Sequence, residues 1–249
     1  MGILSVAKGM PNVISGLAGT LGGVFFSAMT IDYASGDTNK FIKTIKQSTL
    51  MTEFLMTIPL SFLIIYGKEF YTLWQPTLDA EQLQVLSILT CMGFILYAGA
   101  NVVSSIFTIT LHVKESSISV LVSGLISITV TLVLVKFTNL GVYAVAGVSS
   151  VVTVIRILGY TVPYSAKFIG KKKSTFMFII LKSLTSTIVL CGLGFLMKLI
   201  IPFNSWFDMI LSAAIFSVLS LVLNMFVVLD KETRTVFIGL VKSKLKKGN

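Results

Sequence analysis

The residues of this chain that could do chemistry are a few charged and amide side chains within or beside long apolar segments. Lys8 lies at the outer end of the first segment, and Asn101 lies deep inside the third. Such groups are costly to place in a bilayer, so each is a candidate functional residue. Lys8 could bind an anionic group or be an ordinary lysine at the outer membrane surface. Asn101 could form a hydrogen bond between helices or provide a polar point on a transport path.

Four further charged residues lie near segment ends. We expect Arg156, Lys182 and Lys198 to reach the membrane surface by snorkelling, because each is within a few turns of water. Glu53 lies about one turn inside its segment and is the one acidic residue that could couple transport to a cation.

The sequence shows no set of residues that is typical of catalysis or metal binding. Cys91 and Cys191 are far apart in apolar segments, so we expect core residues rather than a disulfide or metal ligands. His112 is the only histidine and has no ligand partner nearby in the sequence. No acidic pair or Ser-His-Asp set suggests an enzyme. We therefore expect no enzyme activity, no cofactor and no metal.

The segments that position these residues are membrane spans. Hydrophobic residues make up 55% of the chain and charged residues 12%, with a mean hydropathy of +0.92, which excludes an ordinary soluble domain. Runs of about 20 apolar residues are long enough to cross a bilayer as helices. They lie near 9–31, 48–67, 84–110, 117–137, 140–161, 176–200 and 206–229.

The predicted fold class is all-α, a polytopic bundle of about seven transmembrane helices. A barrel is excluded because the segments are apolar on every face rather than in alternation. The links are short, so consecutive helices should be antiparallel neighbours in one bundle, residues 1–229.

The distribution of basic residues predicts the orientation. Of the 20 Lys and Arg residues, 16 fall on one side of the predicted spans and only Lys8, Lys68, Lys136 and Lys198 on the other. Basic residues stay on the cytoplasmic side. We therefore expect an outer N-terminus and a cytoplasmic C-terminus, with cytoplasmic links around Asp37, Glu115 and Lys171.

The C-terminal segment, 230–249, is predicted to be a basic cytoplasmic tail. Its apolar residues recur at helical spacing among Lys242, Lys244, Lys246 and Lys247. Such a helix could lie on anionic membrane lipid, although a solvated basic tail is the alternative. The net charge of +10 does not indicate nucleic acid, because the basic residues gather at span ends.

The first span combines Pro11 with several glycines, of which Gly19 and Gly23 form a small-xxx-small pair. Pro11 allows a kink, and the glycines allow close approach of a neighbouring helix. Transporters use such helices as moving elements, whereas static packing is the other explanation.

Five sequence stretches together resemble a known family. In order they are VFFSAMTIDYASGDTNK (24–40), IPL (58–60), FYTLW (70–74), NLGVYAVAG (139–147) and VPYSAK (162–167). They resemble the second lobe of Wzx-type polysaccharide transporters, which flip lipid-linked oligosaccharides and belong to the superfamily of multidrug and lipid II flippases. The family usually has a proline near Ser27, where none is present here.

The resemblance implies a fold and a function. Family members have two lobes of six helices, often followed by two more, with the substrate cavity between the lobes. The seven spans would correspond to helices eight to fourteen. The substrate would be an undecaprenyl-pyrophosphate-linked oligosaccharide for surface polysaccharide, flipped across the bacterial cytoplasmic membrane. Lys8 would contact phosphate and Asn101 would contact sugar.

The resemblance covers the second lobe only, so this sequence would supply one wall of that cavity. We expect a truncated gene product or a late start assignment, with a half-transporter that pairs with a second chain as the alternative. Two other functions stay open. One is a cation-coupled multidrug exporter of the same superfamily, with Glu53 as its coupling residue; the other is a non-transporting membrane anchor or assembly subunit.

Overall fold

The computed structural model describes residues 2–200 and 205–247, with side chains up to residue 239. Its helices are α1 (Ile3–Ala34), α2 (Thr38–Trp74), α3 (Ala80–Ile109), α4 (Val113–Phe137), α5 (Val142–Arg156), the π-helix η1 (Ile157–Thr161), α6 (Val162–Phe168), α7 (Met177–Lys198), α8 (Trp206–Val227) and α9 (Lys231–Lys247). The described residues contain no strand.

Seven helical stretches are long and apolar enough to cross a membrane, which confirms the prediction of an all-α polytopic bundle. Helices α5, η1 and α6 join into one of these stretches, Val142–Phe168. The other six are α1, α2, α3, α4, α7 and α8. Each predicted span therefore overlaps one of these seven stretches.

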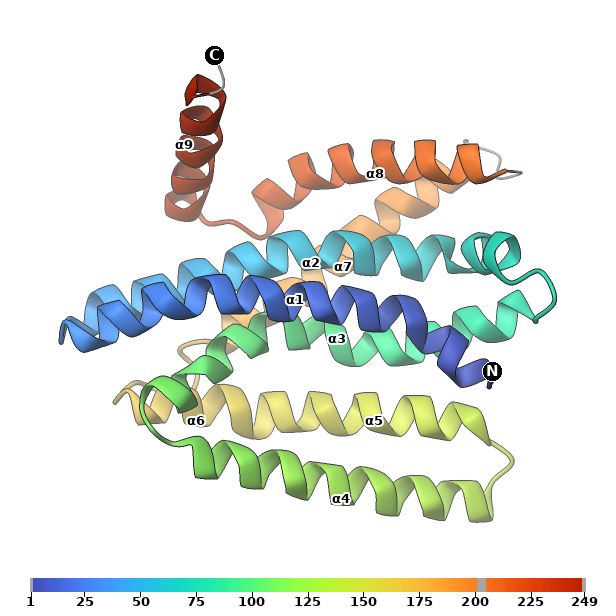
Figure 1. Ribbon diagram of the computed structural model, residues 1–249, viewed down its shortest axis with the longest axis horizontal. Helices are drawn as coiled ribbons and strands as arrows, with labels where there is room; N and C mark the ends of the chain where they lie inside the picture. The colour runs from blue at the N-terminus through green and yellow to red at the C-terminus, as the bar shows by residue number, and fades with distance from the viewer. Residues whose placement is uncertain (1, 201–204, 248–249) are drawn as a thin grey trace.

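Helices α2 and α3 form the centre of the bundle, as Figure 1 shows. Helix α1 packs on both of them, α7 and α8 pack on α2, and α5 packs on α3. Helix α4 lies at the edge of the bundle and contacts mainly α5. No residue of α4 is buried, so this helix is held by fewer apolar contacts than its neighbours.

The links around Asp37, Glu115 and Lys171 lie at one end of the bundle, on the left in Figure 1. At the first of them Gly36 adopts φ +76°, a conformation that glycine adopts without strain. The Asp37 side chain then accepts a hydrogen bond from Lys40 N at 2.9 Å and caps α2. The common location of these links agrees with the alternation of basic and non-basic links in the sequence.

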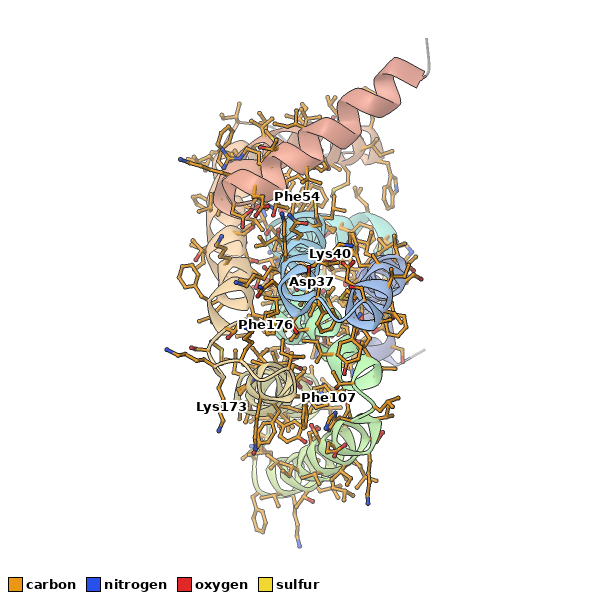
Figure 2. All side chains as sticks on the ribbon, turned by 90° about the vertical axis from the view of Figure 1, so that its left-hand side faces the viewer. Asp37, Lys40, Phe54, Phe107, Lys173 and Phe176 are labelled. Atoms are coloured by element: carbon orange, nitrogen blue, oxygen red, sulfur yellow. The ribbon has the colours of Figure 1, made fainter. Side chains whose placement is uncertain are left out.

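Figure 2 shows this end of the bundle, with Asp37 and Lys40 at the turn between α1 and α2. The Lys40 ammonium forms a 2.8 Å ion pair with Asp32. Lys173 extends outward from the link before α7, whereas Phe54 and Phe176 are buried. Charged groups therefore gather at the rim of this end and aromatic groups in the interior.

A buried polar cluster joins α2, α7 and α8. Asn224 donates to Phe54 O at 2.8 Å and to Thr57 Oγ1 at 2.7 Å, and its Oδ1 accepts a hydrogen bond from Ser186. Ser186 Oγ also lies 3.0 Å from Thr57 Oγ1. Hydrogen bonds of this kind hold membrane helices together where apolar burial contributes little.

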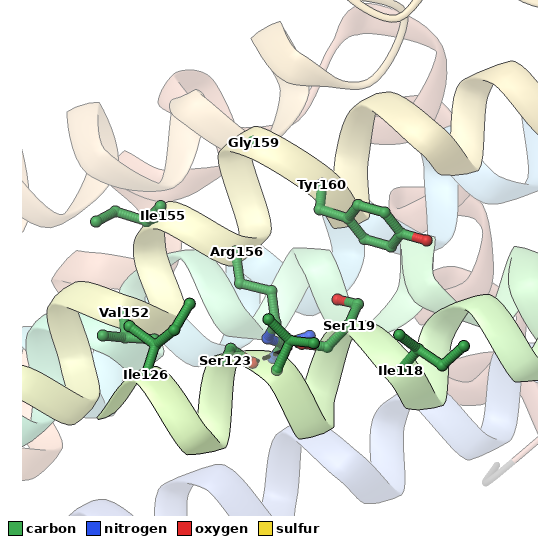
Figure 3. Close-up of a pocket in the computed structure, with 10 residues that line it drawn as sticks. Ile118, Ser119, Ser123, Ile126, Val152, Ile155, Arg156, Gly159 and Tyr160 are labelled. Carbon is green, nitrogen blue, oxygen red and sulfur yellow. Dashed lines mark hydrogen bonds between the residues drawn. The ribbon is translucent and has the colours of Figure 1, made fainter. Parts of the chain in front are cut away.

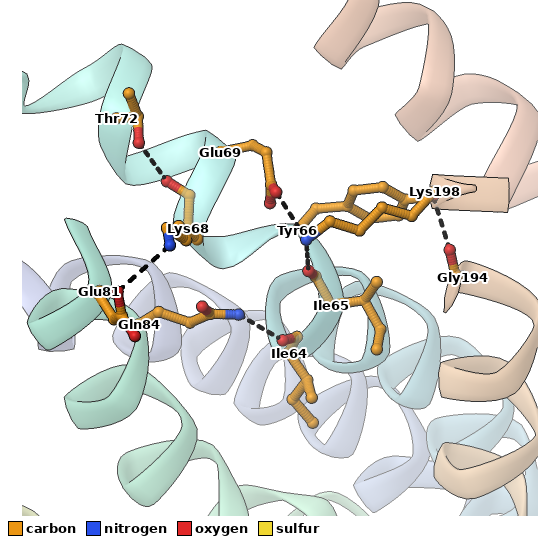
Figure 4. A network of polar contacts seen from close by, with 10 residues as sticks. All are labelled: Ile64, Ile65, Tyr66, Lys68, Glu69, Thr72, Glu81, Gln84, Gly194 and Lys198. Carbon is orange, nitrogen blue, oxygen red and sulfur yellow. Dashed lines mark hydrogen bonds and ion pairs between the residues drawn. The ribbon is translucent and has the colours of Figure 1, made fainter. Parts of the chain in front are cut away.

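Lys198 lies at the opposite end of the bundle in a second polar network (Figure 4). Its ammonium forms a 2.6 Å ion pair with Glu69 and donates to Ile65 O at 3.1 Å. Tyr66 donates from its hydroxyl to Gly194 O at 3.0 Å. These contacts tie α7 to α2, so Lys198 has a structural role here.

Candidate functional site

Lys8 lies where α1, α3 and α5 meet. It lines a cavity of about 140 Å³ whose other polar residues are Asn12, Thr90, Ser149, Ser150 and Thr153. Helices α3 and α5 approach closely beside it at Gly93, where an added Cβ would lie 3.1 Å from Ser150 Cα. The predicted anion-binding residue is therefore positioned in a polar cavity.

A second polar cavity lies beside the first. It has a volume of about 230 Å³, lies between α4 and α5, and shares Ser149 and Thr153 with the Lys8 cavity. Ser123, Ser127 and Arg156 supply its other polar groups. We call the two cavities together the polar groove. Lys8 lies at one end of this groove and Arg156 at the other.

The spacing of residues on α5 explains why one face of this helix is polar. Ser149, Thr153 and Arg156 are separated by four and three residues, which places them on the same side of an α-helix. On α4, Ser123 and Ser127 are also four residues apart, and Ser127 Oγ lies 3.5 Å from Ser149 Oγ. The two polar faces therefore meet along the groove.

Arg156 is the most unusual residue of the groove. Its side chain extends from α5 toward α4, close to Ser119 and Ser123 (Figure 3). Its Nη1 donates to Thr161 Oγ1 at 3.4 Å, and no carboxylate of the described residues forms an ion pair with it. An arginine within a membrane span and without a counter-ion is well suited to bind a phosphate or carboxylate ligand.

The π-helix begins at the residue after Arg156, Ile157. Single π-turns inside α-helices are frequent at functional sites, because the wider turn changes the direction of neighbouring side chains. The sequence alone predicts a snorkelling side chain at Arg156, and nothing in it indicates the π-turn. The polar spacing from Ser149 to Arg156 was the available signal for this face.

Asn101 does not line the polar groove. It lies on α3 against Gly22 of α1, where a Cβ added to Gly22 would lie 2.8 Å from Asn101 Nδ2. Gly22 is 14 residues from Lys8, which corresponds to about 21 Å along an α-helix. The structure therefore does not bring Lys8 and Asn101 together, and a sugar contact at Asn101 stays a prediction.

Glu53 is fully buried between helices, and neither of its carboxyl oxygens has a hydrogen-bond partner. Its side chain packs on Gly99 of α3, where an added Cβ would lie 2.8 Å from Glu53 Cδ. No described residue forms an ion pair with it, and the Lys182 ammonium donates to Val228 O at 3.3 Å. An isolated charge at this position would be costly, which favours a neutral carboxyl.

The residues predicted to act as a hinge lie along α1. The helix continues through Pro11, which is buried. A Cβ added to Gly19 or Gly23 would meet nothing within 4 Å, so these glycines face away from the described bundle. Their role in packing against another helix stays a prediction.

The predicted membrane-surface residues Lys242, Lys244, Lys246 and Lys247 lie outside the residues whose side chains the structure describes. Helix α9, which carries them, is attached at its first turns. Glu232 forms an ion pair with Lys43, and the Phe237 ring lies 5.2 Å from that of Phe54. The start of α9 is thus fixed beside α2.

Comparisons with known proteins indicate a membrane protein. It is similar to the uncharacterized membrane protein EpsK of Bacillus subtilis (strain 168), with 22% identity over 231 residues. The chain is a multi-pass membrane protein. The match covers 90% of this chain but 44% of EpsK, so the chain spans less than half the length of that relative. No protein-family model and no solved structure matches the chain.

Proposed function

We propose that the chain forms one wall of a transporter that moves a lipid-linked, anionic oligosaccharide precursor from the cytoplasmic to the outer leaflet for surface polysaccharide synthesis. The observation that carries this proposal is the polar groove, which runs through membrane-spanning helices between Lys8 and Arg156. Hydroxyl groups between two cations suit a ligand that combines sugar with phosphate.

The opposite wall of the path would come from another part of the protein or from a partner chain. The partial coverage of EpsK is compatible with a further portion of comparable size. Alternating access would then expose the groove to each side of the membrane in turn. In the proposed orientation, Lys8 faces the outer leaflet and Arg156 lies toward the cytoplasmic leaflet. The protein would move its ligand without changing it chemically.

Replacing Lys8 with glutamate tests the outer end of the groove. In cells that depend on this protein for surface polymer, Lys8→Glu is expected to abolish polymer export while the protein still inserts, because it repels phosphate from the cavity. Lys136→Glu is the matched control. Lys136 lies in the last turn of α4 and does not line the groove, so this variant should export normally.

Two results would contradict the proposal. Normal export by Lys8→Glu would remove Lys8 from the site. Failure of the complete transporter, reconstituted in liposomes, to move a labelled lipid-linked sugar would instead favour the anchor or assembly function. Membrane insertion and protein amount are measured in every variant.

A second candidate function is a cation-coupled exporter of drugs, favoured by the buried and unpartnered carboxyl of Glu53. A carboxyl of this kind can bind and release a proton when its surroundings change. If this function is correct, Glu53→Gln should abolish cation-dependent drug efflux at an unchanged protein level, because glutamine cannot release a proton. Efflux that survives the substitution would leave this function without its coupling residue.

A further inference from the structure

An apolar groove runs beside the polar groove along the same two helices. It consists of two cavities of about 410 and 550 Å³ that share Ile126, Val152 and Ile155. The smaller lies toward Tyr160, and the larger lies toward Tyr143 and is closed on one side by Leu89 of α3. We refer to these two cavities as the apolar groove.

Helix α4 leaves this groove open because it packs loosely on α5. No residue of α4 is buried. The Tyr160 hydroxyl donates to Glu115 O at 3.2 Å and closes the cytoplasmic end of the helix pair. Gly159 adds to the free space, since a Cβ at this position would meet nothing within 4 Å. In a bilayer, hydrocarbon chains would fill such a groove.

The length of the groove indicates how long a hydrocarbon chain it can hold. On α4 its lining runs from Ile118 to Leu134, and on α5 and η1 it runs from Tyr143 to Tyr160. The α4 range covers 16 residue steps, or about 24 Å of α-helix. The hydrocarbon core is about 30 Å thick, so one leaflet accounts for about 15 Å. A phospholipid acyl chain would fill only part of this length, whereas a polyprenyl chain could fill it all.

Arg156 lies where the two grooves meet, because it lines the smaller apolar cavity and the second polar cavity. Its guanidinium has no carboxylate partner among the described residues. A ligand that fits this junction has a phosphate between a polar portion and a long hydrocarbon chain.

We propose that the apolar groove between α4 and α5 binds the polyprenyl chain of a polyprenyl phosphate lipid whose phosphate contacts Arg156. This inference rests on the proposed function for the identity of the transported lipid. It adds the location of the hydrocarbon chain, which would remain between these two helices while the sugar occupies the polar groove. Helices α4 and α5 would thus recognise the carrier lipid by its hydrocarbon chain.

The test fills the groove with a bulky side chain. Ile126 lines both apolar cavities, and Ile126→Trp would place an indole where they join. Ile128→Trp is the matched control, because Ile128 lies on the same helix, is similarly exposed (60% against 49%) and lines neither cavity. Binding of polyprenyl monophosphate to the purified chain in lipid nanodiscs is measured by native mass spectrometry, with phosphatidylglycerol as competitor.

We expect Ile126→Trp to weaken polyprenyl phosphate binding by about tenfold, the loss when roughly two methylene groups are excluded from an apolar site. Ile128→Trp should bind as the unsubstituted chain does. Equal binding by both variants would overturn the inference. Equal competition by phosphatidylglycerol would also overturn it, because the occupant would then be an ordinary anionic lipid.

The outcomes separate this inference from the proposed function. If the complete transporter moves no lipid-linked sugar but Ile126→Trp still weakens binding selectively, the groove is a polyprenyl site and the transport proposal fails. If transport occurs and Ile126→Trp binds and transports normally, the transport proposal stands and the assignment of the groove fails.

Discussion

Alanine at position 99 is expected to destabilise the bundle by about 1–3 kcal/mol, the usual cost of inserting a carbon into a filled interior. Its Cβ would lie 2.8 Å from Glu53 Cδ and 2.9 Å from Glu53 Cγ. Glu53 is fully buried, so its side chain cannot move out into solvent and can yield only by repacking against the neighbouring helices. The carboxyl must either displace α3 from α2 or take up a strained rotamer.

Thiol labelling during heating measures this effect. Cys91 is buried on α3, the helix that carries Gly99, so in a Cys191→Ser background its reaction with a thiol-specific dye reports loss of packing. Gly99→Ala should shift the labelling transition to lower temperature. Gly19→Ala is the control, since its Cβ meets nothing within 4 Å and it gains the same helix propensity. Each protein is compared in the same detergent.

A double substitution identifies Glu53 as the cause. Glu53→Ala in the Gly99→Ala background removes the atoms that the new Cβ would meet, so most of the lost stability should return. If Gly99→Ala labels like the unsubstituted chain, the close packing of Glu53 on α3 is wrong. If the double variant is no more stable than Gly99→Ala, the clash lies with another group.

Glutamine at position 156 is expected to weaken binding of polyprenyl phosphate by about 10- to 100-fold, since a charged hydrogen bond contributes about 1.5–3 kcal/mol. The substitution removes the charge but keeps hydrogen-bond donors and much of the side-chain length. Polymer export should fall in parallel. The affinity of Arg156→Lys should lie between those of the unsubstituted chain and Arg156→Gln, because lysine keeps the charge but loses the planar pair of donors.

Uncharged polyprenol provides the control for Arg156. It offers the same hydrocarbon chain without phosphate, so Arg156→Gln should bind it as tightly as the unsubstituted chain does. Equal losses for both lipids would mean that the substitution damages the fold of α5. Unchanged binding of the phosphate lipid would exclude Arg156 as the phosphate contact and leave the guanidinium bonded to Thr161 alone.

The sequence predicts the elements better than their contacts. Span length follows from the thickness of the bilayer, so hydropathy alone locates seven helices. Asp37, which caps α2, is likewise visible beside a glycine in a short link. The packing of Glu53 on Gly99 joins two helices, and nothing local in either one indicates it.

The candidate site was predictable only in part. Lys8 is conspicuous because it is a charged residue beside a long apolar segment, and the structure places it in a polar cavity. Its distance from Asn101 depends on how α1 and α3 align, which hydropathy does not determine. In the sequence, Arg156 is one of several basic residues near span ends. Only the packing of α4 against α5 shows that it lines a polar cavity.

Because α4 buries none of its side chains, fewer apolar contacts hold it than hold α2 or α3. In the two-stage view of membrane protein folding, a helix first inserts and then associates with its neighbours. For α4 the second stage buries no side chain, and its outward-facing side chains contact hydrocarbon before and after association. Displacement of α4 from α5 therefore costs little, and the pair can separate far enough to admit a lipid sideways from the bilayer.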